Sequence, residues 1–321
     1  MGTFRLWSDE MEAMRAEARE VIAAGRGLMG LDARPSSDRP RDDQVAAARE
    51  SMAVVTFPSP DAEARVIGGV PCRVFRPEGA PRAIYLHFHG GGMISGSAAV
   101  MDIPNQLTAK EHGVVVVSVE YRQAPEFPWP AGPDDGVAVA RALLGAVGVE
   151  LGSDRLLIGG ESAGGYMAAI VLLRIRDELH AADRVLGANL VFGVYDWGRS
   201  PSQRGIRPTD GIDMLDPVGI EFFTECYLPG LTDDERRDPS ISPAFADLRN
   251  LPPALMTVGT ADHLLDDTLM LSARWAAAGS EVELLVLPDM PHGFMAVPCE
   301  MAKHWVKRTY QWFAARLDAD G

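Results

Sequence analysis

Residues 155–165 read Arg-Leu-Leu-Ile-Gly-Gly-Glu-Ser-Ala-Gly-Gly, and this stretch decides the fold. An apolar run leads into a G-x-S-x-G pattern centred on Ser162, and small residues follow it. A strand that turns sharply into a helix at such glycines lifts the serine hydroxyl above a sheet, beside a helix N-terminus that favours negative charge. An incidental serine in a glycine-rich turn is the alternative. The flanking strand and helix favour a nucleophile at Ser162.

Outward from this stretch, apolar strands alternate with helices. The strands are predicted at 52–57, 64–68, 70–76, 83–87, 114–119, 155–159, 187–194, 254–259 and 282–287, and the intervening helices at 98–112, 134–148, 163–178, 266–278 and 300–317. This alternation indicates an α/β fold, with a mostly parallel sheet covered by helices on both faces. The first strands have no helices between them, so they are predicted to form an antiparallel edge.

The chain is predicted to contain a catalytic domain, formed by 49–195 and 246–321, and two additions. Residues 1–48 are predicted to hold an amphipathic helix over 9–27, a Pro/Asp/Arg-rich connection over 28–43 and a helix near 43–50. The segment 196–245 interrupts the alternation and has one helix near 217–226. An insertion of this kind is typical of a lid, so both additions are predicted to form a helical cap.

A second glycine-rich loop, His89-Gly-Gly-Gly92, follows the strand at 83–87. Consecutive glycines expose backbone N–H groups, which can stabilise the oxyanion of a tetrahedral intermediate. The N–H groups of Gly91, Gly92 and Ala163 are the predicted donors. A flexible loop or a phosphate-binding loop is the alternative, but no G-x-x-x-x-G-K-[S/T] pattern supports phosphate binding.

The nucleophile needs a base, and the base needs a carboxylate that orients it. His292 lies in a Pro/Gly-rich loop directly after the strand at 282–287, and Asp262 holds the matching place after 254–259. Catalytic groups gather in loops of this kind, so these two residues are predicted to complete a triad with Ser162. The other candidates are His180, His263 and His304 for the base, and Asp266 and Asp267 for the acid.

Composition limits the partners and the compartment. The formal net charge is −15. Nucleic acids and anionic membranes bind basic surfaces, so this acidic balance argues against both as partners. The three cysteines, Cys72, Cys226 and Cys299, are widely spaced and are predicted to be free thiols in a reducing compartment. The N-terminus has no secretory pattern, and the most continuous apolar run, 114–119, is too short to cross a bilayer. A cytoplasmic protein without membrane insertion is predicted.

Together the motifs resemble the hormone-sensitive-lipase-like esterases, also called bacterial family IV, over about residues 70–317. The matching stretches are His89-Gly-Gly-Gly92 with Ser95-Gly-Ser97, Glu120-Tyr-Arg122 with Ala124-Pro-Glu126 and Pro128, 160–165, Asp262 with Asp266, and His292-Gly-Phe294. The resemblance implies an α/β-hydrolase fold with an eight-stranded sheet, a helical cap, and ester hydrolysis without a metal or organic cofactor. Dimers are common in that family, although no feature of this sequence specifies a homodimer.

The sequence departs from the family pattern at three positions. Glu161 stands where many relatives have Asp or Thr, Met93 where an aromatic residue is frequent, and His263 where proline is usual. None of these departures removes a catalytic group, so they bear on substrate preference.

The predicted function is hydrolysis of small-molecule esters with short- to medium-chain acyl groups, through an acyl-enzyme. The histidine must be neutral to act as a base, so activity is expected to fall below about pH 6–7. An amidase or deacetylase, an acyltransferase, and a non-catalytic receptor of the same fold are the alternatives.

Overall fold

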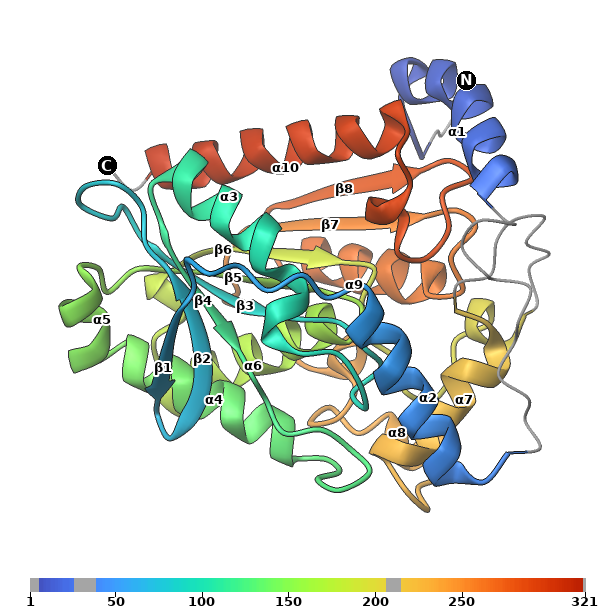
Figure 1. The fold of residues 1–321 in the computed structure, drawn as a ribbon, viewed down its shortest axis with the longest axis horizontal. Coiled ribbons are helices and arrows are strands. Elements are labelled where there is room, and N and C mark those ends of the chain that lie inside the picture. The colour runs from blue at the N-terminus through green and yellow to red at the C-terminus, as the bar shows by residue number, and fades with distance from the viewer. Residues whose placement is uncertain (1–5, 26–38, 206–214, 320–321) are drawn as a thin grey trace.

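An eight-stranded sheet in the order β1-β2-β4-β3-β5-β6-β7-β8 forms the centre of the computed structural model, which describes residues 6–25, 39–205 and 215–319 (Figure 1). The strands are β1 (Glu63–Ile67), β2 (Val70–Phe75), β3 (Ile84–Phe88), β4 (Val115–Val119), β5 (Leu156–Glu161), β6 (Val185–Val191), β7 (Ala254–Gly259) and β8 (Val282–Leu287). The pairs β1–β2 and β2–β4 are antiparallel and the other pairs are parallel. The mostly parallel sheet and its antiparallel edge are therefore confirmed.

Helices cover both faces of this sheet. They are α1 (Asp9–Gly25), α2 (Arg41–Val54), α3 (Asp102–His112), α4 (Ala131–Leu143), α5 (Ala146–Leu151), α6 (Ala163–Leu179), α7 (Pro217–Tyr227), α8 (Asp233–Arg236), α9 (Leu265–Ala277) and α10 (Glu300–Asp318). Figure 1 shows α3 and α10 on one face and α4 and α6 on the other. Every residue of β3, β4, β5 and β7 is buried, as the continuous apolar runs of doubly covered strands require. None of the helices in the described ranges has the length and apolar character needed to cross a membrane.

The strand predicted at 52–57 is wrong. Residues up to Val54 belong to α2, which is longer than the helix predicted near 43–50. The β-branched Val54 and Val55 and the aromatic Phe57 suggested a strand. All three side chains are exposed, however, and the backbone of these residues pairs with no strand of the sheet. The predicted connection over 28–43 lies, up to residue 38, outside the described residues.

The N-terminal helices contact the loops that carry the predicted chemistry. From α1, Arg15 and Arg19 form ion pairs with Asp289, three residues before His292. From α2, Arg49 donates to the carbonyl of Ile94 at 2.9 Å, just past the triple-glycine loop. Arg41 of α2 also donates to the Glu225 carbonyl of α7 at 3.2 Å, so the two predicted additions are in contact.

The three cysteines are buried and form no disulfide, as predicted. Burial raises the pKa of all three thiols, and that of Cys72 to about 12. Buried, protonated thiols are poor nucleophiles.

Asp267 connects the segment after β6 to α9. Its fully buried carboxylate accepts hydrogen bonds from the Tyr195 and Asp196 N–H groups, both at 2.8 Å, and from Ser200 Oγ at 2.7 Å. Gln203 Nε2 donates to both carboxylate oxygens, at 2.9 and 2.8 Å. One side chain thus satisfies donors that would otherwise be buried without a partner.

We expect Asp267→Ala to lower the free energy of unfolding by roughly 3–5 kcal/mol, because several buried donors lose their acceptor at once. Urea denaturation followed by circular dichroism would measure the change. Asp234→Ala is the matched control, since that side chain is 98% exposed, and it should cost no more than about 0.5 kcal/mol. Similar losses in both variants would contradict this structural role.

Candidate active site

Ser162 lies at a strained turn between β5 and α6. Its backbone has φ 56° and ψ −120°, a conformation that non-glycine residues rarely adopt. A Cβ atom at Gly160 or Gly164 would lie 2.2 or 1.9 Å from the Phe88 carbonyl oxygen of β3. Only glycine fits at these two positions, and this close approach explains the spacing of the G-x-S-x-G pattern.

The structure brings Ser162, His292 and Asp262 together. Ser162 Oγ lies 2.9 Å from His292 Nε2, and His292 Nδ1 lies 2.9 Å from Asp262 Oδ2. With the imidazole proton on Nδ1, the histidine donates to the carboxylate and accepts from the serine hydroxyl. A nucleophile, a base and an orienting acid are therefore arranged in series.

Two loops at the carboxyl ends of β7 and β8 position the acid and the base. The Thr260 N–H donates to the Leu287 carbonyl at 2.9 Å, and the Ala261 N–H donates to the Met290 carbonyl at 3.1 Å. A Cβ atom at Gly259 would lie 1.9 Å from that Met290 oxygen. The glycine thus lets the loops approach closely enough for Asp262 to reach His292.

The Asp262 carboxylate is fully buried. Its second oxygen, Oδ1, accepts from the Leu264 N–H at 2.8 Å, so the side chain is held from both sides. A buried carboxylate that is fixed in this way can hold the imidazole in one tautomer and orientation.

The alternative acids and bases lie elsewhere. His263 Nδ1 is 2.9 Å from the Ser202 carbonyl oxygen, and Asp266 accepts from the Ser202 N–H at 2.9 Å. His304 lies 3.4 Å from Glu10 of α1, and His180 ends α6. None of them takes part in the series that begins at Ser162.

The predicted oxyanion donors lie next to the nucleophile. A Cβ atom at Gly90 would be 3.4 Å from Ser162 Cβ, so the glycine loop passes directly beside the serine. Gly91 and Gly92 have φ values of 126° and 62°, and Ala163 is the first residue of α6. Among the hydrogen bonds of the described residues, the N–H groups of Gly91, Gly92 and Ala163 have no protein acceptor. They are available to a ligand oxygen.

Sequence reasoning missed two aromatic residues at this site. The Phe192 ring, just after β6, lies 4.6 Å from the His292 ring, measured between centroids. The Phe223 ring of α7 is so close to Gly92 that a Cβ atom there would lie 2.7 Å from it. Both contacts join segments far apart in the chain, so no local pattern could have revealed them.

His89 supports the glycine loop from beneath. Its ring stacks on Tyr121 at 4.4 Å, its Nδ1–H donates to the Gly90 carbonyl at 2.7 Å, and the Tyr121 hydroxyl donates to the His89 carbonyl at 2.8 Å. Burial of the ring lowers the pKa of His89 to about 4. The imidazole therefore stays neutral over the range in which most enzymes work.

This pKa shift predicts a dependence of stability on pH. Between about pH 6.5, the ordinary histidine value, and about pH 4, the unfolded chain binds a proton at His89 that the folded chain does not. Lowering the pH through this window should therefore destabilise the fold, by roughly 2–3 kcal/mol in total. Urea denaturation at a series of pH values should show a steeper loss in the wild type than in His89→Gln. Parallel curves would rule out this contribution.

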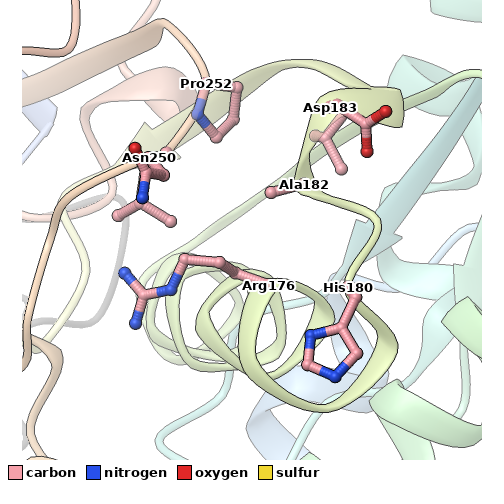
Figure 2. A pocket seen from close by; sticks show the side chains of 8 residues that line it. Arg176, His180, Ala182, Asp183, Asn250 and Pro252 are labelled. Carbon is pink, nitrogen blue, oxygen red and sulfur yellow. The ribbon is translucent and has the colours of Figure 1, made fainter.

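A surface hollow at the amino ends of the sheet strands, opposite the triad, is also lined by a histidine and an acid. Figure 2 shows Arg176 on α6 and His180 directly after its last residue, with Asp183, Asn250 and Pro252 around them. The hollow borders the amino ends of β6 and β7, whereas the triad lies at the carboxyl ends of the sheet strands. The Arg176 guanidinium is already bonded to the Asp247 and Arg249 carbonyl oxygens. In sheets of this kind ligands bind at the carboxyl ends of the strands, so this hollow is not the candidate active site.

The chain is similar to known hydrolases in sequence and in structure. The family model described as the alpha/beta hydrolase fold matches residues 85–296. Carboxylesterase NlhH of Mycobacterium tuberculosis is 36% identical over 239 residues, which span 70% of this chain and 71% of that protein. Ethyl acetate hydrolase of Pseudomonas putida is 32% identical over 239 residues, with the same coverage. The crystal structure of a hormone-sensitive lipase from a metagenome library has a TM-score of 0.74 and 31% identity, covering 96% of this chain and 97% of that one.

Proposed function

Because this chain belongs to the hormone-sensitive-lipase-like branch of the α/β-hydrolase family and is a serine carboxylesterase, we propose that Ser162, His292 and Asp262 are its catalytic triad. The observation that carries this assignment is the series of 2.9 Å contacts from Ser162 through His292 to Asp262. We also propose that Gly91, Gly92 and Ala163 form the oxyanion hole.

The geometry supports a two-step reaction. Ser162 Oγ attacks the ester carbonyl carbon while His292 Nε2 takes its proton, and the backbone N–H groups of the oxyanion hole stabilise the tetrahedral intermediate. His292 then gives the proton to the departing alcohol, leaving an acyl-enzyme. A water molecule that loses its proton to His292 attacks this acyl group, and collapse of the second intermediate releases the acid and restores Ser162.

The proposed cap consists of α1, α2, α7 and α8. Of these, α7 and α8 lie within 196–245 and α1 lies within 1–48, whereas α2 continues six residues beyond the predicted boundary at 48, to Val54. Its helices reach the catalytic loops at defined contacts: Arg15 and Arg19 at Asp289, Arg49 at Ile94, and Phe223 at Gly92. A cap attached in this way limits the space above the nucleophile.

Short to medium acyl chains are the proposed substrates. The Phe223 ring lies directly against Gly92. If Gly92 is an oxyanion-hole residue, as proposed here, this ring narrows the space for the ester group. A relative with 32% identity is named for the hydrolysis of ethyl acetate, a small ester. Both observations favour small esters over long-chain lipids.

We expect kcat/KM to be at least about tenfold higher for p-nitrophenyl butyrate than for p-nitrophenyl dodecanoate, because each poorly accommodated methylene loses part of its binding energy. Phe223→Ala should reduce this ratio several-fold by opening the space over Gly92. Val218→Ala, an exposed position on the same helix, should leave the ratio unchanged. A wild-type preference for dodecanoate would overturn the proposed chain length, and equal rates on butyranilide would point to an amidase.

A further inference from the structure

A cavity of about 330 Å³ lies between α3, α10 and the sheet face that these helices cover. Its lining includes His87 of β3, Glu161 of β5 and Asn189 of β6, together with side chains from both helices. Neither Ser162 nor His292 lines it. It is therefore a separate space on the other side of the turn that carries the nucleophile.

The mouth of this cavity is apolar and open to solvent. Ile103 and Leu107 of α3 are 50% and 48% exposed, and Val306 of α10 is 40% exposed, although all three are large aliphatic side chains. Single exposed aliphatic residues are ordinary on protein surfaces, but these three border the same cavity. An apolar ligand body would cover them.

The interior contains polar atoms without partners. His112 Nε2, Asn189 Oδ1 and Thr309 Oγ1 are buried and lack a hydrogen-bond partner among the described residues, as does Trp305 Nε1. The residues His112, Asn189 and Thr309 are each more than nine-tenths buried, and all four side chains line the cavity. Buried polar groups in folded proteins are usually hydrogen-bonded. Several unpaired polar atoms in one cavity therefore indicate that a ligand supplies the missing hydrogen-bond partners.

The charges of the lining define which ligand fits. Glu161 is the one carboxylate in the lining, where its Oε2 lies 3.0 Å from His87 Nε2, and the lining contains no Lys or Arg. Burial lowers the pKa of His112, which favours its neutral form. The lining thus offers no Lys or Arg to hold an anion, and it places a carboxyl group where an anion would have to bind.

We propose that this cavity is a binding site for a small neutral molecule with an apolar body and a hydroxyl group. A hydroxyl both donates and accepts, so it can donate to Asn189 Oδ1 and accept from Trp305 Nε1–H or Thr309 Oγ1–H. A hydrocarbon would leave these atoms unpaired, and a carboxylate would bring a charge with no counter-charge. The site is distinct from the acyl-transfer site and does not depend on the triad.

The test uses full-length protein whose Ser162 has been blocked with diisopropyl fluorophosphate, with 1-hexanol as the probe. The indole N–H signal of Trp305, assigned by its loss in Trp305→Phe, should shift with saturation as hexanol is added to ¹⁵N-labelled protein. Hexanoate has the same chain length and a negative charge, and it should bind at least about tenfold more weakly. Absence of a saturable shift, or equal binding of hexanoate, would overturn the proposal.

Variants at Thr309 locate the site. Thr309→Leu fills the cavity and should weaken hexanol binding at least about tenfold, while Thr309→Val removes the hydroxyl at nearly constant volume and should weaken it several-fold. Val149→Leu, an exposed position on α5, is the control and should bind as the wild type does. If Thr309→Leu does not fold, hexanol binding by Thr309→Val still tests whether the cavity is the binding site. Unchanged binding in a folded Thr309 variant would place the hexanol elsewhere.

Discussion

Replacing Ser162 with alanine is expected to lower kcat for p-nitrophenyl butyrate by about 10⁵-fold or more, the size of loss seen when a triad serine is removed. The expectation follows from the 2.9 Å contact between Ser162 Oγ and His292 Nε2, which links the hydroxyl to its base. Without the hydroxyl no acyl-enzyme forms, so the pre-steady-state burst of p-nitrophenol should also disappear. Stopped-flow absorbance measures both quantities.

A second serine provides a demanding control. Ser118 Oγ lies 3.0 Å from His87 Nδ1, and His87 Nε2 lies 3.0 Å from Glu161 Oε2, so a serine, a histidine and a carboxylate are in series here too. Ser118 is fully buried, however, and its backbone belongs to the regular strand β4. A buried hydroxyl on a regular strand is not placed to attack a substrate from solution.

Ser118→Ala should therefore keep at least about a tenth of wild-type activity, and a fluorophosphonate probe should label Ser162 alone. Labelling of Ser118, or turnover that survives in Ser162→Ala, would transfer the nucleophile to another residue. Both serines contact a histidine that contacts a carboxylate, but only Ser162 lies at a strained turn. The two variants therefore test whether that backbone geometry is needed for catalysis.

The parts of the site that could be predicted from the sequence depend on local backbone requirements. Gly160 and Gly164 around Ser162, and Gly91 in the second glycine-rich loop, are needed because neighbouring backbone leaves no room for a Cβ atom. Such requirements leave a fixed spacing in the chain. The positions of most strands and their mostly parallel arrangement likewise followed from the apolar runs, since strands covered on both faces exclude polar residues. The order of the strands in the sheet was not predicted.

Other features depend on contacts between distant segments and could not be predicted in this way. The run at 52–57 has strand-forming residues, yet the helix before it continues to Val54 and residues 52–57 pair with no strand of the sheet. His292 was predicted over His263 from its place in a loop after a strand, but the close approach of the loops after β7 and β8 at Gly259 and Met290 is a tertiary contact that no local pattern contains. Propensity is a weak guide where tertiary packing decides.

Replacing Asp262 with asparagine is expected to lower kcat by about 10⁴-fold while the protein stays folded, as for the corresponding change in a serine protease. Asp262 Oδ1 accepts from the Leu264 N–H, which fixes the orientation of the side chain. An asparagine that keeps this bond through its carbonyl oxygen turns its amide N–H groups toward His292 Nδ1. His292 Nδ1 must then accept a hydrogen bond, so the imidazole proton moves to Nε2. A protonated Nε2 can no longer take a proton from Ser162.

Asp266→Asn is the matched control, because this carboxylate accepts from the Ser202 N–H and does not contact His292. It should lose less than about tenfold in kcat. Thermal denaturation should show that both variants are folded, so that a loss of activity reports on chemistry. If Asp262→Asn kept more than a tenth of the activity while Asp266→Asn lost nearly all of it, the orienting acid would be Asp266. The expected order follows from one requirement: the acid must accept a hydrogen bond from His292 Nδ1, and Asp262 is placed to do so at 2.9 Å.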